Sequence, residues 1–181
     1  MIQELDFRIL DWIQANLRTP WMDWLMPRIS ALGNAGMIWI VLAVIFLLRR
    51  PTRRWGMTMA VGLLGSLLVC NLVLKNAVAR PRPCWINQEI ALLIAVPKDY
   101  SFPSGHTTAG FITSVVLLRC HRRVGLCALF LAALVAFSRL YLYVHFPTDV
   151  LGGALIGAAV GFAAVELCRM VLFREKTIQA E

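Results

Sequence analysis

The sequence contains few charged residues, and acidic residues are rarer than basic ones. Only 15% of the 181 residues are charged, with 18 Lys and Arg against 10 Asp and Glu, which gives a formal net charge of +8. In a soluble protein this balance would suggest a nucleic-acid partner. Here no RNA- or DNA-binding motif accompanies it, and the basic residues form short clusters between long apolar runs. Such runs indicate an integral membrane protein surrounded by lipid, with no nucleic-acid partner.

Other features are missing as well, and each absence narrows the possibilities. The five cysteines include no pair with disulfide or metal-ligand spacing, so we predict neither a disulfide nor a metal site, and no cofactor. The first residues are acidic and amphipathic, without a basic start and an apolar run, so no secretory signal peptide is expected. No internal repeat and no linker interrupts residues 1–181, which therefore predict a single domain.

Apolar runs are what the sequence does contain, and they predict an all-α polytopic membrane helix bundle. Residues 1–30 are expected to form amphipathic interfacial helices, residues 31–172 the transmembrane bundle, and residues 173–181 a cytoplasmic tail. Near the end of the bundle a glycine every fourth residue predicts close helix packing. About five spans are expected: Ala31–Leu48, Trp55–Leu74, Ser104–Leu118, Val124–Val144 and Val150–Leu172, with Gly153, Gly157 and Gly161 on the last and Glu166 paired with Arg169 near its end.

The arrangement of basic residues predicts an orientation. With five spans, the arginine clusters at 49–54 and 119–123, together with Arg174 and Lys176, fall on one side of the membrane. Basic loops mark the cytoplasmic side. The loops on the opposite side would face the exterior, or the periplasm if this is a bacterial plasma membrane.

The stretch between the last two spans carries charge where charge is expensive. Arg139 is followed by His145 and then, four residues later, by Asp149. Ionisable residues at a membrane boundary are a functional-site hypothesis by default. If Pro147 opens a helical turn, Asp149 shares a face with His145 and can hold one imidazole nitrogen, leaving the other free as a nucleophile. The guanidinium of Arg139 offers a fork of donors suited to phosphate.

Two further polar clusters fall on the same side of the predicted bundle. Lys75 is followed by six residues and then by Arg82-Pro83, and Pro103-Ser104-Gly105-His106 opens the third span. Phosphoryl transfer needs placement and countercharge, which these cations could supply. Ser104 and Gly105 would begin a helix whose free N–H groups suit an anion.

Taken together, the three clusters match the three-part signature of the type 2 phosphatidic acid phosphatase superfamily of membrane phosphatases. The resemblance covers roughly Lys75–Asp149. It implies a reaction in which His145 attacks phosphorus to form a phosphohistidine while Asp149 fixes its tautomer. No outward cluster of carboxylates and histidines shows metal-ligand spacing, so we expect this reaction to be metal-independent. The resemblance also implies that His106 protonates the leaving oxygen and later activates water. Phosphate-binding residues would be Lys75, Arg82, Ser104, Gly105 and Arg139.

Neighbouring cations should lower the pKa of both histidines, which suits His145 as a neutral nucleophile but not His106 as an acid. We therefore expect a dianionic substrate to restore the proton on His106 when it binds.

Each residue alone also has a structural explanation. Lys75 could be an interfacial anchor, Ser104 a helix cap and Asp149 a cap of the last helix. Arg80 lies within the first motif without being a defining position, and it could be solvated or could steer substrate. Glu89 and Asp99 are expected to be solvated loop carboxylates.

The expected reaction is hydrolysis of a lipid phosphate or diphosphate, with undecaprenyl diphosphate converted to undecaprenyl phosphate as the first choice. Phosphatidylglycerophosphate or phosphatidic acid hydrolysis is the close alternative, and a lipid phosphotransferase is a further one. From another class, the chain could be a transporter or a catalytically inactive bundle, although inverted repeats or helices broken in mid-membrane are not evident. An apolar patch, Ile90–Val96, could be a rim or lid for lateral entry of the lipid.

Overall fold

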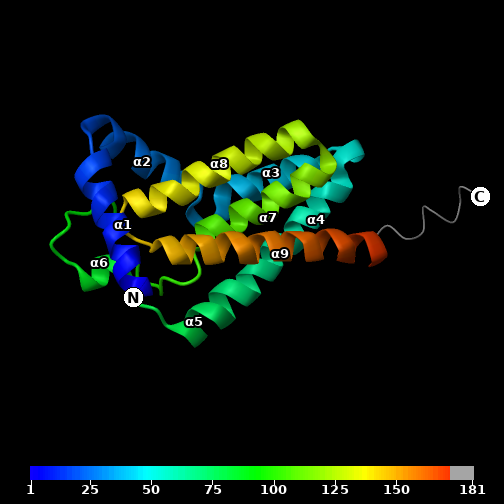
Figure 1. Ribbon diagram of the computed structural model, residues 1–181. Helices are drawn as coiled ribbons and strands as arrows, with labels where there is room; N and C mark the ends of the chain where they lie inside the picture. The colour runs from blue at the N-terminus through cyan, green and yellow to red at the C-terminus, as the bar shows by residue number, and fades with distance from the viewer. Residues whose placement is uncertain (172–181) are drawn as a thin grey trace, which may run out of the picture.

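The apolar runs form helices that lie alongside one another, with α1 and α2 set across one end of the bundle (Figure 1). The computed structural model describes residues 1–171, so the last residue of the fifth expected span and the expected tail 173–181 lie outside the described residues. No strand occurs within residues 1–171. In chain order the helices are α1 (Ile2–Leu17), α2 (Pro20–Leu32), η1 (Asn34–Gly36), α3 (Met37–Leu48), η2 (Arg50–Thr52), α4 (Arg53–Ser66), the π-helical η3 (Leu67–Leu74), α5 (Lys75–Val78), α6 (Pro83–Ile86), α7 (Gly105–Cys120), α8 (Arg122–Tyr141) and α9 (Pro147–Val171).

The predicted all-α membrane bundle is confirmed. Three helical stretches among the described residues are long and apolar enough to cross a membrane: Arg50–Ile86, Arg122–Tyr141 and Pro147–Val171. A fourth crossing is possible only if α2 joins the stretch Asn34–Leu48, across a bend of 46°. The remaining expected span, α7, has 16 residues, and it packs against α4, α8 and α9. Its flanks are covered by protein on most sides, so α7 is the central helix of the bundle.

The first expected span was wrong in one respect, because Ala31–Leu48 is not one straight helix. α2 ends at Leu32, and the chain turns through positive φ at Ala35 (50°) and Gly36 (71°) before α3 begins. Gly33, just before this turn, lets the chain pass close to the site. A Cβ on Gly33 would lie 2.6 Å from Cδ2 of His106, so only glycine lets the chain pass this close to that ring.

The glycine repeat on α9 does provide the predicted close packing. A Cβ on Gly157 would lie 2.6 Å from the carbonyl oxygen of Thr108, and one on Gly153 would lie 2.8 Å from that of Ser104. These contacts bring the backbone of α9 against α7 near the start of both helices. The first turns of the two helices are therefore held side by side, and both carry residues of the predicted site.

The N-terminal helix α1 is amphipathic, as predicted. Ile2, Leu5 and Trp12 of its apolar face are 69%, 57% and 57% exposed. Asp6, Leu10 and Ile13 are buried, so another face, which carries a carboxylate, contacts the bundle. The exposed apolar face remains available to the membrane interface.

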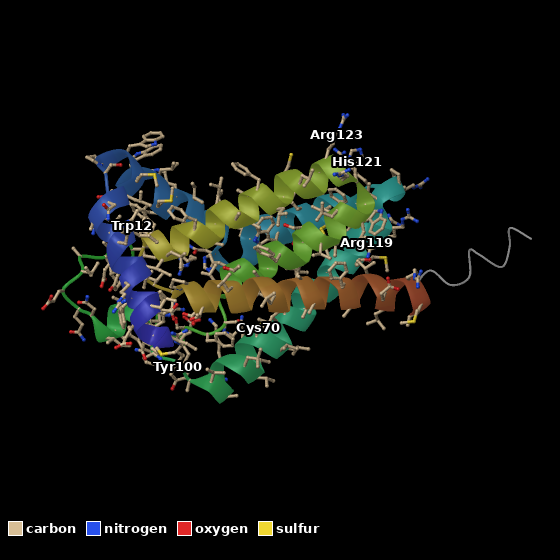
Figure 2. The ribbon with its side chains drawn as sticks, viewed as in Figure 1. Trp12, Cys70, Tyr100, Arg119, His121 and Arg123 are labelled. Carbon is tan, nitrogen blue, oxygen red and sulfur yellow. The ribbon has the colours of Figure 1, made fainter. Side chains whose placement is uncertain are left out.

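Basic residues gather at the opposite end of the bundle from α1. Figure 2 shows Arg119, His121 and Arg123 at that end, whereas Trp12 of α1 lies at the other. The predicted pair of Arg169 and Glu166 also forms, with 2.9 Å between Nη2 and Oε2. The bundle therefore has one strongly basic end and one end covered by α1 and α2.

Candidate active site

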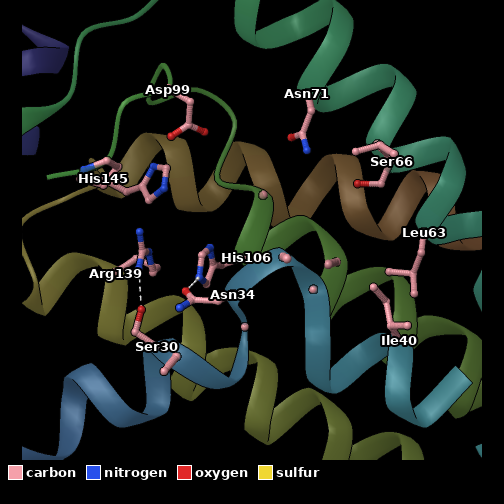
Figure 3. Close-up of a pocket in the computed structure, with 18 of the residues that line it drawn as sticks. Ser30, Asn34, Ile40, Leu63, Ser66, Asn71, Asp99, His106, Arg139 and His145 are labelled. Carbon is pink, nitrogen blue, oxygen red and sulfur yellow. Dashed lines mark hydrogen bonds between the residues drawn. The ribbon is translucent and has the colours of Figure 1, made fainter. Parts of the chain in front are cut away.

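The three sequence clusters meet in one cavity. A cavity of about 900 Å³ is lined by Lys75, Arg82, His106, Arg139 and His145, which come from separate helix ends and loops (Figure 3). The same cavity continues between α3 and α4. Its apolar walls there include Ile40, Val44 and Leu47 of α3 and Ala60, Leu63, Leu64 and Leu67 of α4 and η3. A polar pocket is thus joined to an apolar cleft between two helices.

The two cations of the first cluster share one partner, Asp99. Nζ of Lys75 pairs with Oδ2 of Asp99, and Nη2 of Arg82 lies 2.8 Å from Oδ1. Although partial burial alone would raise the pKa of Asp99, the hydrogen bond from Lys75 and the charge of Arg82 lower it to about 2. The expectation that Asp99 is a freely solvated loop carboxylate is therefore wrong. Glu89, by contrast, is exposed, as expected.

His145 is buried between Arg82 and Ser101 in the loop that joins α8 to α9. Nη1 of Arg82 lies 3.1 Å from Nε2 of His145, and Oγ of Ser101 lies 3.4 Å from Nδ1. Because an arginine can only donate, this arrangement assigns the proton to Nδ1 and the lone pair to Nε2. Nε2 is the imidazole nitrogen beside the cation, as a nucleophile toward phosphorus requires.

Asp149 holds His145 less directly than the spacing suggested. Its Oδ2 lies 3.7 Å from Nδ1 of His145, outside hydrogen-bond distance. The hydroxyl of Ser101 donates to Oδ2 and lies between the two side chains, and the N–H of Phe146 donates to the same oxygen at 2.8 Å. The carboxylate therefore orients the loop and Ser101, and through them the imidazole.

Burial controls the charge of His145. The imidazole is enclosed, and burial together with the charges of Arg82 and Arg139 holds its pKa well below the ordinary 6.5. The ring is therefore neutral near pH 7, with the lone pair of Nε2 directed at Nη1 of Arg82.

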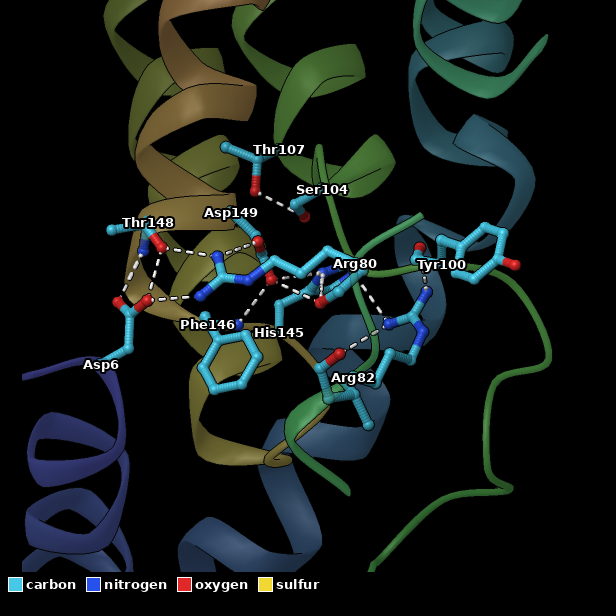
Figure 4. Close-up of polar contacts among 12 residues, drawn as sticks. Asp6, Arg80, Arg82, Tyr100, Ser104, Thr107, His145, Phe146, Thr148 and Asp149 are labelled. Atoms are coloured by element: carbon cyan, nitrogen blue, oxygen red, sulfur yellow. Dashed lines mark hydrogen bonds and ion pairs between the residues drawn. The ribbon is translucent and has the colours of Figure 1, made fainter. Parts of the chain in front are cut away.

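Arg80 is neither solvated nor placed to steer substrate. Its Nη1 lies 2.6 Å from Oδ1 of Asp149, and its Nη2 lies 2.7 Å from Oδ2 of Asp6 (Figure 4). Asp6 in turn accepts from the N–H of Thr148 at 3.1 Å and from its hydroxyl at 2.6 Å. The guanidinium also stacks over Phe146, 4.1 Å from the ring centre. Arg80 thus ties α1 to the first turn of α9, on the side of Asp149 away from Ser101.

The start of α7 faces the cavity as predicted. Ser104 is its N-cap, and the Ser104 N–H donates to the carbonyl of Asp149 at 3.2 Å while its hydroxyl accepts from Thr107 at 3.0 Å. Gly105 lines the cavity, and a Cβ there would meet only Oδ1 of Asn71, at 3.6 Å. Packing does not require this glycine, so its value would lie in access of a ligand to the helix N–H groups.

The remaining two site residues are held from the break between α2 and α3. Nε2 of His106 lies 3.1 Å from Oδ1 of Asn34, and Nη1 of Arg139 donates to the hydroxyl of Ser30. Arg139 is buried, and its Nε has no hydrogen-bond partner within residues 1–171. Arg139 lines the cavity, and a buried guanidinium there suits an anion that enters it.

Four polar residues that hold the site residues in place do not lie in the three sequence motifs. Asp6, Ser30, Asn34 and Ser101 hold Arg80, Arg139, His106 and Asp149 respectively. The available signals were an acidic residue in an amphipathic helix and a Gly-Asn pair before an apolar run. Neither pattern identifies the site residue that the side chain contacts.

Six of the residues predicted for the site line the cavity: Lys75, Arg82, Gly105, His106, Arg139 and His145. Asp149 lies behind His145, 3.7 Å from its Nδ1, and Ser104 is buried with its N–H on the carbonyl of Asp149. Within the described part of the chain, no three His, Cys, Asp or Glu side chains form a group able to hold a metal ion. The arrangement comprises a neutral imidazole, three buried cations and a helix start. Chemically, it can hold a tetrahedral anion and offer it a nitrogen nucleophile.

Comparison with known proteins agrees with this geometry. Residues 55–171 match the model of the PAP2 superfamily. The chain is 32% identical over 149 residues to an undecaprenyl-diphosphatase of Sulfolobus acidocaldarius, covering 81% of this chain and 70% of that protein. It is 33% identical over 161 residues to phosphatidylglycerophosphatase B of Bacillus subtilis, covering 81% and 75%.

A solved structure is similar over nearly the whole chain. The crystal structure of a transmembrane PAP2 type phosphatidylglycerolphosphate phosphatase from Bacillus subtilis superposes with a TM-score of 0.76 at 29% identity, covering 94% of this chain and 87% of that one. The sequence match, the fold and the convergence of the three motifs agree. This chain belongs to the PAP2 superfamily of membrane phosphatases.

Proposed function

We propose that this membrane lipid phosphatase removes the terminal phosphate of a lipid phosphate or diphosphate through a phosphohistidine on His145. The observation that carries the proposal is the cavity itself, in which Nε2 of His145 and three cations face a space continuous with an apolar cleft. A lipid whose tail lies between α3 and α4 would present its head group to His145. The segment around Ile94–Pro97 lines the same cavity and could form its rim.

Each step of the reaction has a residue to perform it. Lys75, Arg82 and Arg139 would neutralise the phosphate oxygens, with the N–H groups at the start of α7 as further donors. Nε2 of His145 would bond to phosphorus as the bond to the lipid oxygen breaks, and His106 would give that oxygen a proton. Water, deprotonated by His106, would then cleave the P–N bond and release inorganic phosphate. The countercharge comes from side chains, so we propose that no metal ion is needed.

Undecaprenyl diphosphate is the proposed substrate. The relatives include proteins named for this activity and for phosphatidylglycerophosphate hydrolysis at nearly equal identity, so similarity alone does not choose between them. The cleft is apolar and opens between two helices, which suits a long prenyl chain as well as two acyl chains. Phosphatidylglycerophosphate and phosphatidic acid are therefore the second candidates.

We further propose that the site faces the exterior of a bacterial plasma membrane. The basic cluster at 119–123 lies at the end of the bundle away from α1 (Figure 2). The positive-inside rule places such a cluster in the cytoplasm. The cavity with His145 would then open toward the outer leaflet.

The test is phosphate release by the purified protein in detergent, with a metal chelator present. Wild type is compared with His145→Ala and with His121→Ala, a matched control because His121 is exposed and lies away from the cavity. The proposal predicts chelator-resistant release that persists in the control and is lost in His145→Ala. Release that needs added metal, or that survives in His145→Ala, would contradict the mechanism, and no release from any lipid phosphate would favour a transporter or an inactive bundle.

Substrate and acceptor need a second experiment. Isoprenyl diphosphates, isoprenyl phosphates and glycerophospholipid phosphates are compared by kcat/KM. The highest value for a prenyl diphosphate supports the first choice. Transfer of phosphate to an added lipid alcohol, in place of release to water, would identify a phosphotransferase.

A further inference from the structure

One carboxylate already occupies the position that the proposed function gives to the substrate phosphate. Asp99 places one oxygen on Lys75 and the other on Arg82, and it lines the same cavity as His145 (Figure 3). Two oxygens of a tetrahedral phosphate would need the same two donors. Within residues 1–171, Lys75 has no other hydrogen-bond partner for its ammonium group. Asp99 and a bound phosphate therefore compete for the same positive charge.

The side chain of Asp99 can leave without unfolding its loop. It is 54% exposed, so its carboxylate can rotate into water. The Asp99 backbone carbonyl accepts from Nε of Arg82 at 2.7 Å, and Nη1 of Arg82 donates to the carbonyl of Val144 at 2.6 Å. These two bonds keep the guanidinium in place when the carboxylate moves. Nη2, which also lies 3.5 Å from the carbonyl oxygen of Tyr100, would then be able to donate to a phosphate oxygen.

We propose that Asp99 is an internal competitor that sets the affinity threshold for anions at the active site. The inference rests on the proposed function and deepens it by naming the class of head group that is retained. A bound anion must displace one carboxylate from Lys75 and Arg82, and the same free energy is subtracted from the binding of every anion. Only a ligand that interacts with the cations more strongly than a carboxylate does remains bound.

Charge decides which lipid head groups pass this threshold. A phosphodiester carries one negative charge, as Asp99 does, so exchanging one for the other changes little. A terminal phosphate can carry close to two charges and has a further oxygen for Arg139, which lines the same cavity. The site would therefore ignore the monoanionic diester lipids that surround it and retain terminal phosphates. Asp99 would thus set which anions remain bound at the site without changing the ratio of their affinities.

Asp99→Asn tests the proposal because it removes the charge while keeping the shape of the side chain. Binding of inorganic phosphate and of dimethyl phosphate is measured by calorimetry at pH 8, with the wild type and with variants purified in detergent. Loss of one charge-assisted competitor should tighten phosphate binding roughly 10- to 100-fold. Dimethyl phosphate binding should tighten by the same factor and become measurable. Asp99→Glu, which restores a carboxylate, should bind both anions nearly as weakly as the wild type.

Glu89→Gln is the matched control, because Glu89 is an exposed carboxylate of the same connecting segment and pairs with no cation within residues 1–171. Its phosphate affinity should equal that of the wild type. Equal or weaker phosphate binding by Asp99→Asn would overturn the proposal and make Asp99 a support for Lys75 and Arg82 instead. Binding of inorganic phosphate needs no turnover, so this result stands apart from whether the protein hydrolyses a lipid.

Discussion

The contact between α1 and the active site makes a prediction about stability. Asp6 is buried and accepts three hydrogen bonds, one from Nη2 of Arg80 and two from Thr148. Asp6→Ala removes all three, leaves one end of Arg80 unpaired, and leaves the N–H of Thr148 in the first turn of α9 without its cap. Activity should fall with stability, because Arg80 also holds Asp149.

The magnitude follows from the geometry. Breaking a buried ion pair costs roughly 3–5 kcal/mol when the partner charge stays behind. The Arg80 side chain is 20% exposed, so water recovers part of this cost. We expect a loss of about 3 kcal/mol in the free energy of unfolding. For a chain of this size, that corresponds to a fall of roughly 6–12 °C in Tm.

Thermal unfolding in detergent measures this change, with kcat followed in the same preparations. Glu4→Gln is the control, because Glu4 is an exposed acidic residue of the same helix, and its Tm should stay near that of the wild type. Asp6→Asn keeps an acceptor for Thr148 and should fall between the two. A Tm for Asp6→Ala equal to that of Glu4→Gln would refute the role assigned to this contact.

Three more outcomes are expected. Gly33→Ala places a Cβ 2.6 Å from the His106 ring and should lower kcat at least tenfold. Gly65→Ala is the control, because its Cβ would meet only a side chain at 3.8 Å, and its kcat should stay unchanged. Equal kcat values for the two variants would contradict the role assigned to Gly33. His106→Ala should still form phosphoenzyme from a substrate with a good leaving group, since only protonation of that group is lost; absence of phosphoenzyme would argue against this role. Burial lowers the pKa of His145 below the ordinary 6.5. Below about pH 6.5 the unfolded chain therefore binds a proton that the folded chain does not, and the free energy of unfolding falls as the pH falls. The decrease in Tm between pH 7 and pH 5 should therefore be smaller in His145→Gln, and an unchanged decrease would show that His145 does not contribute.

Helix positions followed from the sequence wherever long apolar runs determined them. The runs predicted the helices that end at Leu48 and Tyr141 to within a few residues, and the glycine repeat predicted the face of α9 that meets α7. The break between α2 and α3 was missed, because apolar residues continue on both sides of it, and the close approach of Gly33 to the ring of His106 exists only in the folded bundle. The pattern of apolar residues in the sequence does not predict that contact.

The sequence identified the charged residues of the site but not the residues with which each of them pairs. The spacing of His145 and Asp149 suggested a direct hydrogen bond, but the hydroxyl of Ser101 lies between them. A serine in a loop has no pattern that marks such a role. Asp99 and Arg80 were likewise assigned to solvent or substrate because their partners, Lys75 and Asp6, are set by tertiary structure.

The covalent intermediate is the most direct measurement of the proposed mechanism. A lipid diphosphate labelled at its terminal phosphorus is mixed with the protein, and the reaction is quenched in alkali, where a phosphohistidine is stable. The proposed mechanism predicts label on His145, retained in His121→Ala and absent from His145→Ala. Label that remains in His145→Ala, or release of phosphate without any labelled protein on the time scale of a single turnover, would contradict it.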